Sequence, residues 1–152
     1  MECCSHVLAV ERVADVLPEL HELHLLHWQE TEKYRHGLPF QPDYEAVLAS
    51  ERAGQVVQFT ARQAGQMVGN LRVYLQTSRH TGTRFAKEDT LFVHPGHRGG
   101  WLAMHLLRYA ETVLKGLGVR EIRADSKLSN RADVLMRRMG YEPVSTQFVK
   151  FF

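Results

Sequence analysis

Residues 55–93 contain three segments in which apolar and polar side chains alternate, and this run constrains the fold more than any other feature. Residues 55–62 and 85–93 each predict a strand. In the central segment Met67, Gly69, Leu71, Val73 and Leu75 alternate with Val68, Asn70, Arg72, Tyr74 and Gln76. Because successive side chains of a strand point to opposite faces, this pattern predicts a half-buried antiparallel strand. Ala64-Gly65 predicts a hairpin turn before it, and residues 78–84 form a polar, basic loop after it.

The chain before this run predicts a short strand followed by two helices. Residues 6–10 have the composition of a strand. Residues 15–28 place apolar side chains at helical spacing, with Pro18 in the first turn, where proline is tolerated. Residues 34–42 contain a glycine and two prolines and predict a loop, and residues 43–53 predict a second, shorter helix.

The chain after this run returns to helical periodicity. Residues 102–117 place six leucine or valine side chains and an alanine on one helical face, and two glycines close the segment. Residues 120–124 predict a short strand, residues 130–139 a short helix ended by Gly140, and residues 141–152 a last strand. A helix between two strands allows one parallel pairing here.

The expected order is β-α-α-β-β-β-α-β-α-β, an α+β (mixed α/β) fold with one mostly antiparallel sheet flanked by helices. The 152 residues suit a single domain, residues 1–152, with one sizeable core. Apolar residues make up 44% and charged residues 24% of the chain, the balance of an ordinary water-soluble domain. The formal charge of +2 is too small to indicate nucleic-acid binding by itself.

The two cysteines, Cys3 and Cys4, are adjacent, so neither a disulfide framework nor a zinc site can be built from them. A reducing cytoplasm is therefore the expected compartment. No apolar run is long enough to span a membrane, and the first ten residues lack the pattern of a signal peptide.

The stretch HPGHRGGWLA, residues 94–103, joins the third strand to the long helix. The first N–H groups of a helix have no partner within it and lie at its positive end, so they bind anions. Glycines allow a phosphate to approach the backbone closely, and Arg98 adds a positive charge. The other interpretation of this weak local signal is an ordinary strand-to-helix loop with a surface arginine.

Two longer segments carry a resemblance to a known family: LFVHPGHRGGWLAMHLLRYAE, residues 91–111, and NRADVLMRRMGYEPV, residues 130–144. They resemble the GNAT superfamily, the acyl-CoA-dependent N-acetyltransferases. More narrowly, RGG…LLRYAE together with the terminal EPV…FVKFF, residues 142–152, resembles its members encoded by bacteriophages and prophages. The matching positions are Val93 and Pro95 at the strand end, Arg98, Gly99, Gly100 and Ala103 in the turn, and the closing pair Gly140-Tyr141.

The resemblance implies an enzyme that transfers an acetyl group directly from acetyl-CoA to an amine. The residues that it implies for CoA binding are Phe92, Val93, Arg98, Gly99, Gly100, Trp101, Leu102, Ala103 and Asn130. An exposed backbone N–H near residues 92–94 would polarise the thioester carbonyl. The acceptor is left open between a small molecule, a protein N-terminus or lysine, and an aminoacylated tRNA. Besides the acceptor, a second copy of the chain is a candidate partner, in a homodimer.

Two residues depart from the family pattern. Trp101 replaces the middle glycine of the turn, although its backbone N–H can still donate to an anion. Met136 replaces a tyrosine that in many members donates a proton to the CoA thiolate, and its position on an apolar helical face predicts core packing. The thiolate can nevertheless leave as an anion, because its pKa is near that of cysteine, about 8.5.

Glu88 and Asp89 are the candidate general bases at the start of the third strand. Strict alternation would place Glu88 on the face of Thr90 and Phe92, and Asp89 on the opposite face. If the latter face is the core, Glu88 is the better candidate, although an acid at a strand start is commonly just solvated. Glu30 and Glu32, after the first helix, are weaker candidates near the acceptor.

His21, His24 and His27 follow one another at three-residue spacing. Each such step rotates a side chain by about 60° around a helix, so these imidazoles do not converge and no metal site is expected. The basic residues of the loop at 78–84 are expected to be solvated. Two other functions stay open: a CoA-binding or regulatory protein that has lost transferase chemistry, which Trp101 and Met136 favour, and a nucleic-acid-associated module without CoA.

Overall fold

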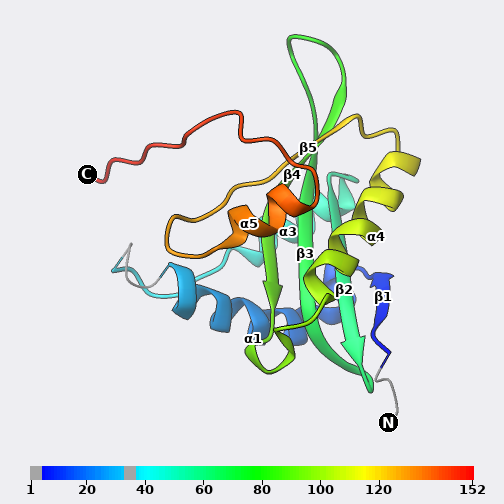
Figure 1. Ribbon diagram of the computed structural model, residues 1–152, viewed down its shortest axis with the longest axis vertical. Coiled ribbons are helices and arrows are strands. Elements are labelled where there is room, and N and C mark those ends of the chain that lie inside the picture. Colours follow the sequence, from blue (N-terminus) through cyan, green and yellow to red (C-terminus); the bar gives the residue numbers. More distant parts are fainter. Residues whose placement is uncertain (1–4, 33–36) are drawn as a thin grey trace.

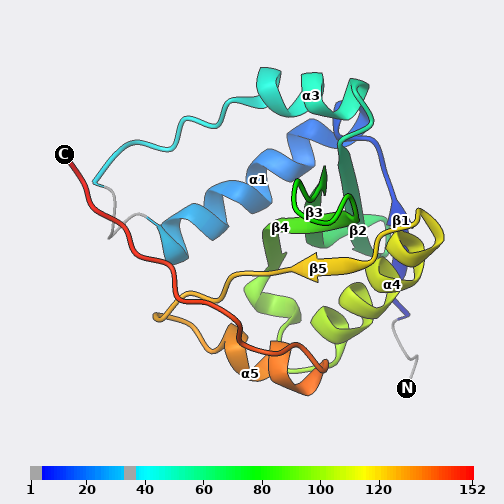
Figure 2. The ribbon, with the colours of Figure 1, turned by 90° about the horizontal axis from the view of Figure 1, so that it is seen from above.

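The computed structural model describes residues 5–32 and 37–152. One five-stranded sheet has the order β1-β2-β3-β4-β5. Helices α1 and α3 cover one face of the sheet, and α4 and α5 cover the other (Figures 1 and 2). The elements are β1 (Val7–Val10), α1 (Val13–Thr31), α3 (Tyr44–Arg52), β2 (Val56–Gln63), β3 (Gln66–Thr77), β4 (Arg84–Val93), α4 (Leu102–Gly116), β5 (Glu121–Arg123) and α5 (Ala132–Arg138). The expected single α+β domain is therefore observed, with its last strand as the exception.

Strands β1 to β4 form an antiparallel meander, as the alternating pattern predicts. Ala64 and Gly65 connect β2 to β3 with positive φ angles of 47° and 81°, the combination that tight two-residue hairpins require. The predicted parallel pairing joins β4 to β5, in the register Phe85↔Glu121, Ala86↔Ile122 and Lys87↔Arg123. Beyond residues 87 and 123 the two strands separate, which leaves one edge of β4 without a neighbouring strand.

The prediction of a half-buried β3 is wrong, because the strand is buried on both faces from Met67 to Val73. The apolar side chains of Val68, Leu71, Val73 and Leu75 pack under α4, whereas Met67 packs on the α1 face. The polar side chains of Asn70 and Arg72 are covered by α1, and they are 0% and 7% exposed. Their burial is tolerated because β4 supplies partners: Thr90 donates to Asn70, and Asp89 pairs with Arg72.

The α4 face of the sheet carries the larger apolar core. Leu106 and Leu114 of α4 are almost fully buried there, and Met136 of α5 is 8% exposed in the same cluster. The predicted core packing of Met136 is confirmed. On the other face, α1 packs Leu20 and Leu23 against Phe92 and Met67 in a smaller cluster.

The predicted strand at residues 141–152 is wrong. The chain there is extended but forms no strand, and its apolar side chains are exposed, with Phe148 at 89%. Figure 1 shows the segment running away from the sheet. A strand needs a hydrogen-bonding neighbour, and the short β5 pairs only with β4. The apolar and aromatic residues of this segment therefore do not by themselves make it a strand.

Two sequence predictions fall at least partly on residues that the structure does not describe. Cys3 and Cys4 lie outside the described ranges, and so does part of the predicted loop at residues 34–42. Of the helices in the described ranges, none has the length and apolar character that crossing a membrane requires.

Candidate active site

The turn between β4 and α4 is built from a short 3-10 helix, Pro95–His97, followed by two glycines and Trp101. Gly99 has a φ of +88°, a conformation that favours glycine. A Cβ added to Gly99 or Gly100 would meet no atom within 4 Å, so both glycines border open space. The backbone of this turn is therefore accessible from outside.

The N-terminus of α4 lacks the usual protein caps. Trp101 is its N-cap residue and makes no side-chain capping bond, and the first turn contains no acidic residue. The first backbone bond of the helix runs from the His105 N–H to the Trp101 carbonyl at 2.9 Å. The N–H groups from Leu102 to Met104 precede that bond and are unsatisfied by the helix. An anion is a fitting partner for such an end.

Trp101 itself is 65% exposed, with an ordinary φ of −98°. Its indole therefore extends into solvent and does not fill the core beneath the turn. The replacement of glycine by tryptophan does not distort the backbone here, because the position needs no left-handed conformation.

The guanidinium of Arg98 is held by groups of the protein. Its Nε donates to the Val93 carbonyl at 2.8 Å, and its two terminal nitrogens donate to the carboxylate of Glu30, each at 2.8 Å. The guanidinium also lies 5.0 Å from the centre of the Phe92 ring. Glu30, a weak candidate base in the sequence, thus joins the end of α1 to the turn. Arg98 also lowers the pKa of the Glu30 carboxyl, chiefly by this hydrogen bonding.

The free edge of β4 presents its backbone at alternate residues. The His94 N–H donates to the Val68 carbonyl of β3 at 2.8 Å. Because antiparallel hydrogen bonding alternates, Phe92 faces β3 in the same way, whereas Leu91 and Val93 direct their N–H groups away from it. Phe92 and Val93 are the two strand residues that the sequence predicts to bind CoA, and of these Val93 directs its backbone N–H to the open edge. Phe92 is 4% exposed and stacks on His27 at 5.0 Å between ring centres.

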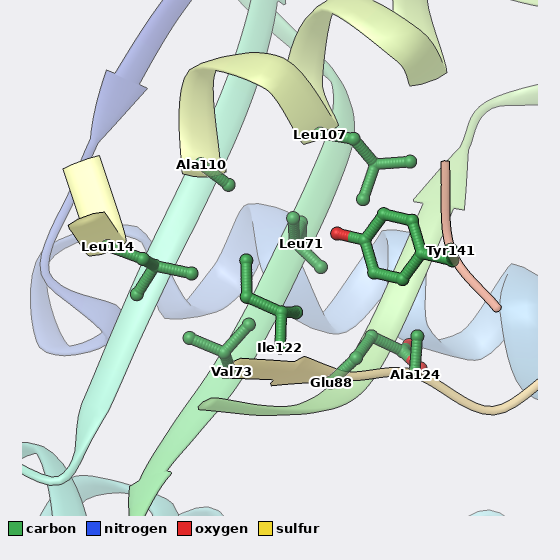
Figure 3. A pocket seen from close by; sticks show the side chains of 9 residues that line it. All are labelled: Leu71, Val73, Glu88, Leu107, Ala110, Leu114, Ile122, Ala124 and Tyr141. Atoms are coloured by element: carbon green, nitrogen blue, oxygen red, sulfur yellow. The ribbon is translucent and has the colours of Figure 1, made fainter. Parts of the chain in front are cut away.

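Glu88 lies where β4 and β5 begin to separate (Figure 3). It lines a small cavity of ≈ 10 Å³ with apolar side chains of β3, α4 and β5 and with Tyr141. Its carboxylate faces the backbone N–H of Asp125 at 3.4 Å. Burial among these apolar groups raises the pKa of Glu88 to about 7, and the Asp125 N–H opposes this rise.

The predicted face of Glu88 is wrong. A bulge interrupts the pairing of β3 with β4, so that Arg72 pairs with Thr90 and Val73 with Glu88, and Asp89 is extra. Glu88 consequently lies on the α4 side, with the cavity, whereas Asp89 pairs with Arg72 on the α1 side. Strict alternation cannot anticipate an inserted residue.

The remaining predicted residues lie near this opening or beside it. Asn130, between β5 and α5, uses its side-chain oxygen to accept the Ala132 N–H at 3.1 Å, which supports the start of α5. Glu32, the C-cap residue of α1, forms an ion pair with Lys127 in the loop after β5. Glu30 and Glu32 thus connect α1 to both sides of the opening between β4 and β5.

A buried polar cluster on the α1 face had no clear sequence signal. His24 is 6% exposed, and its Nδ1 lies 3.1 Å from the Tyr44 hydroxyl, which also lies 3.2 Å from Nδ1 of His21. Burial lowers the pKa of His24 to about 4, so its imidazole is neutral near pH 7. The signal, visible afterwards, is the run of polar residues on β3 that the sequence suggested would face water.

A larger cavity of ≈ 280 Å³ lies between α1 and the start of β3. His94 and His97 from the turn after β4 border it, together with Glu19 and Glu22 of α1. None of the residues predicted to bind CoA lies in it. Among the residues of ranges 5–32 and 37–152, no group of three His, Cys, Asp or Glu could hold a metal ion, and His27 stacks on Phe92 instead of joining His21 and His24.

Residues 17–141 match the acetyltransferase (GNAT) family. The fold is similar to that of a ribosomal-protein-alanine N-acetyltransferase from Brucella melitensis biovar Abortus 2308, with a TM-score of 0.76, 19% identity, and coverage of 97% of this chain and 99% of that one. It is also similar to glucosamine-6-phosphate N-acetyltransferase from Arabidopsis thaliana, with a TM-score of 0.75, 13% identity, and coverage of 97% and 99%.

An aminoglycoside acetyltransferase from an uncultured soil metagenomic sample, whose structure contains sisomicin, is similar as well, with a TM-score of 0.73 and 16% identity over 97% of this chain and 94% of that one. No curated protein has a matching sequence. The match covers the strand, turn and helix that form the open site, and the structural likeness covers nearly the whole chain. The protein therefore belongs to the acetyltransferase (GNAT) family, as an N-acetyltransferase that transfers the acetyl group of acetyl-CoA to an amine acceptor.

Proposed function

We propose that the turn at residues 98–103 and the N-terminus of α4 bind the pyrophosphate of acetyl-CoA. The residues of this turn fit an anion, because the glycines border open space and the first N–H groups of α4 have no partner within the helix. The Trp101 side chain does not cap these N–H groups, and the first turn of α4 contains no acidic residue. The backbone of Val93 and Leu91, at the open edge of β4, supplies hydrogen bonds to the amide-rich arm of the same molecule. Acetyl-CoA brings the acetyl thioester to this edge.

Glu88 is the general base in this proposal. With a pKa of about 7, its carboxylate can accept a proton from the acceptor ammonium, directly or through a water, close to neutral pH. The neutral amine then forms a bond to the acetyl carbon as the carbon–sulfur bond breaks, and the nitrogen releases its surplus proton to solvent to give the amide. An N–H group at the edge of β4 polarises the carbonyl, and the sulfur departs as a thiolate, because the buried Met136 has no proton to donate.

The observation that carries this mechanism is the position of Glu88 at the separation of β4 from β5. Two measurements test it. Acetyl-CoA should raise the melting temperature, and wild-type protein should release CoA thiol when an accepted amine is added. Binding without turnover on any amine would favour the alternative, a CoA-binding or regulatory protein without transferase chemistry. Absence of binding would contradict the CoA site and favour the nucleic-acid-associated module.

The acceptor is an amine of one of three classes: a small molecule, a protein or an aminoacylated tRNA. The similar structures suggest a first panel, since their own names include aminoglycoside, glucosamine 6-phosphate and ribosomal-protein alanine as acceptors. We therefore propose assays with sisomicin, glucosamine 6-phosphate, a peptide with N-terminal alanine, and aminoacylated tRNA. A rate with one class that exceeds the others at least tenfold would identify the acceptor class.

Further properties remain part of the proposal. They are an origin in a bacteriophage or prophage, a cytoplasmic location, catalysis without a metal, and a homodimer. The first rests on the resemblance of residues 98–111 and of the terminal residues 142–152, and the second on the two adjacent cysteines. Full activity after treatment with EDTA would support the third, and a dependence on added Zn²⁺ or Mg²⁺ would contradict it.

A further inference from the structure

The bulge in β4 is the feature that places Glu88. On either side of it the pairing with β3 is regular, since Arg72 faces Thr90 and Val73 faces Glu88. Asp89 is the residue in excess. Because side chains alternate along a strand, one inserted residue exchanges the faces of everything on one side of it. The bulge therefore decides that Glu88, and not Asp89, faces the cavity on the α4 side.

The side chain of the extra residue is anchored. Oδ2 of Asp89 accepts a hydrogen bond from Nε of Arg72 at 2.8 Å, and it lies 2.7 Å from Nη2 of the same guanidinium. Arg72 is 7% exposed beneath α1, and its Nη1 has no partner in the described structure, so Asp89 is the carboxylate that compensates its buried charge. Removal of one partner from such a pair leaves an uncompensated charge, which is strongly unfavourable.

A neighbouring contact stabilises the strand on the same face. The Thr90 hydroxyl donates to Oδ1 of the fully buried Asn70 at 2.9 Å. The two contacts hold consecutive residues of β4, Asp89 and Thr90, to β3 on the side of α1. Two consecutive residues can face the same side only where a bulge interrupts the alternation, and here that bulge is at Asp89 and Thr90.

We propose that Arg72 and Asp89 are positioning residues, whose ion pair, between a buried guanidinium and an exposed carboxylate, maintains the β4 bulge and thereby directs Glu88 to the opening between β4 and β5. This inference rests on the proposed role of Glu88 as the base. Without the pair, the favoured regular pairing of β4 with β3 turns Glu88 toward α1 and away from the cavity that Tyr141 and Ala124 border.

The titratable groups around Glu88 in its present position come from three segments. Lys87 and Asp89 flank it in β4, and Asp125, which pairs with Lys87, lies in the loop after β5. Tyr141 faces the same cavity from the segment after α5. A Glu88 side chain that leaves this apolar site titrates closer to an ordinary carboxyl, so its titration reports its position directly.

The test compares Arg72→Met with Arg62→Met as a matched control. Arg62, on β2, likewise forms ion pairs, in its case with the carboxylates of Glu11 and Glu19. Its partners are not on β4, so its replacement leaves the β4 bulge in place. Carboxyl-carbon NMR titration of glutamate-labelled protein, with Glu88→Gln to assign the signal, follows Glu88 without any acceptor. We expect Arg72→Met to lower the pKa of Glu88 by about one unit or more, which is a tenfold change in its protonation equilibrium, and Arg62→Met to leave it unchanged.

Kinetics supply the second measurement once an amine is accepted. Arg72→Met should lower kcat at least about tenfold with the KM for acetyl-CoA within about twofold, and adding Glu88→Gln should lower kcat little further, because residues that act as a unit are not additive. Arg72→Lys, which keeps the charge, should restore part of the loss. If Arg72→Met does not fold, Asp89→Asn replaces it in the kinetic measurement only, because loss of the Asp89 charge by itself lowers the pKa of Glu88.

An unchanged Glu88 titration in a folded Arg72→Met protein, or an unchanged kcat in a folded Asp89→Asn protein, would overturn the positioning role. This outcome differs from failure of the proposed base. In that case Glu88→Gln would retain full activity, while the titration of Glu88 would still respond to Arg72.

Discussion

At the scale of single residues, the environment of Glu88 determines both its chemistry and its effect on stability. A glutamate carboxyl is normally solvated and ionised at neutral pH. Here the apolar cavity raises its pKa to about 7, so that one side chain can accept and release a proton near the working pH. Asp89, one residue later, stays paired with Arg72 on the opposite face.

Glu88→Gln should lower kcat by about 10²-fold or more and leave the dissociation constant of acetyl-CoA nearly unchanged. The base acts when deprotonated, so the wild-type rate should rise with pH through about 7 and then level, and the variant should lack this limb. Steady-state rates from pH 5.5 to 9, with calorimetry for acetyl-CoA, measure both. A variant with the wild-type pH profile would exclude Glu88 as the base.

Glu88 and His24 should influence stability with opposite pH dependence. The folded pKa of Glu88 is raised, so its favourable contribution is present at acid pH and is lost as pH rises from about 4.3 to about 7. The folded pKa of His24 is lowered, so its contribution is present above about 6.5 and is lost as pH falls toward about 4.

Two variants separate these contributions. Glu88→Gln should gain about 1–2 kcal/mol over wild type at pH 8, less than the full shift would give because the carboxyl is half-buried, and little at pH 4. His24→Gln should lose less stability than wild type between pH 6.5 and 4.5. Urea unfolding at each pH measures these differences, and parallel stability curves for variant and wild type would refute the corresponding assignment.

Trp101→Gly should preserve or strengthen acetyl-CoA binding. The indole is 65% exposed, and the backbone φ of −98° is accessible to any residue, so the side chain is not needed for the turn. Glycine adds conformational freedom at the helix start, which should cost about 0.5–1 kcal/mol of stability. Calorimetry and thermal unfolding read the two effects separately. A large loss of affinity would mean that the indole itself contacts the ligand.

At the scale of elements, the contact between Arg98 and Glu30 joins the end of α1 to the turn before α4. The C-terminal end of a helix disfavours acidic side chains, yet α1 has no basic residue in its last turn and carries Glu30 and Glu32 at this end. Arg98 and Lys127 compensate them from other elements. The helix end is therefore stabilised by the two segments that border the opening.

Arg98→Ala should raise the dissociation constant of acetyl-CoA about tenfold, from loss of a charge-assisted contact worth roughly 1.5–3 kcal/mol. Glu30→Gln is the matched control, because it releases the guanidinium without removing it. If Arg98 contacts the pyrophosphate, Glu30→Gln should bind acetyl-CoA as well as wild type or better. If both variants lose affinity equally, Arg98 acts only as a brace for the turn.

Met136→Tyr tests the packing of α5 against α4. Met136 is 8% exposed within the apolar cluster, so the larger ring should overpack it and lower stability by about 1–3 kcal/mol. If departure of the thiolate limits transfer, the new hydroxyl should keep or raise kcat despite this loss. Thermal unfolding and kcat for one acceptor decide both points, and Met136→Leu, which introduces no hydroxyl, controls for packing. An equal fall of kcat in both variants would remove the proton-donor argument.

At the scale of the whole molecule, the exposed tail and the edge of the sheet favour self-association. Phe148, Phe151 and Phe152 are 89%, 57% and 111% exposed, and β5 ends the sheet with one unpaired edge in the described structure. We expect a homodimer in sedimentation velocity at micromolar concentration. Phe148→Asp with Phe151→Asp should shift it to monomer without loss of the melting transition. A wild-type monomer at these concentrations would contradict this assignment.

The sequence by itself determined the features that depend on neighbouring residues. Alternation and helical period predict the meander from β2 to β4 and the helices on both its faces, and Ala64-Gly65 predicts the hairpin, because side-chain direction and turn conformation are local properties. The strand, turn and helix at residues 91–111 likewise predicted the family, and the apolar face of α5 predicted the burial of Met136.

Only the tertiary structure decided the features that depend on residues far apart. Arg72 and Asp89 maintain a bulge that reverses the predicted face of Glu88. Glu30, from α1, binds Arg98 of the turn. The tail at residues 141–152, predicted as a strand, forms none, because no strand in the described part of the chain pairs with it. In each case a side chain or segment obtains its partner from another element, and the free energy of that pairing is absent from any local pattern.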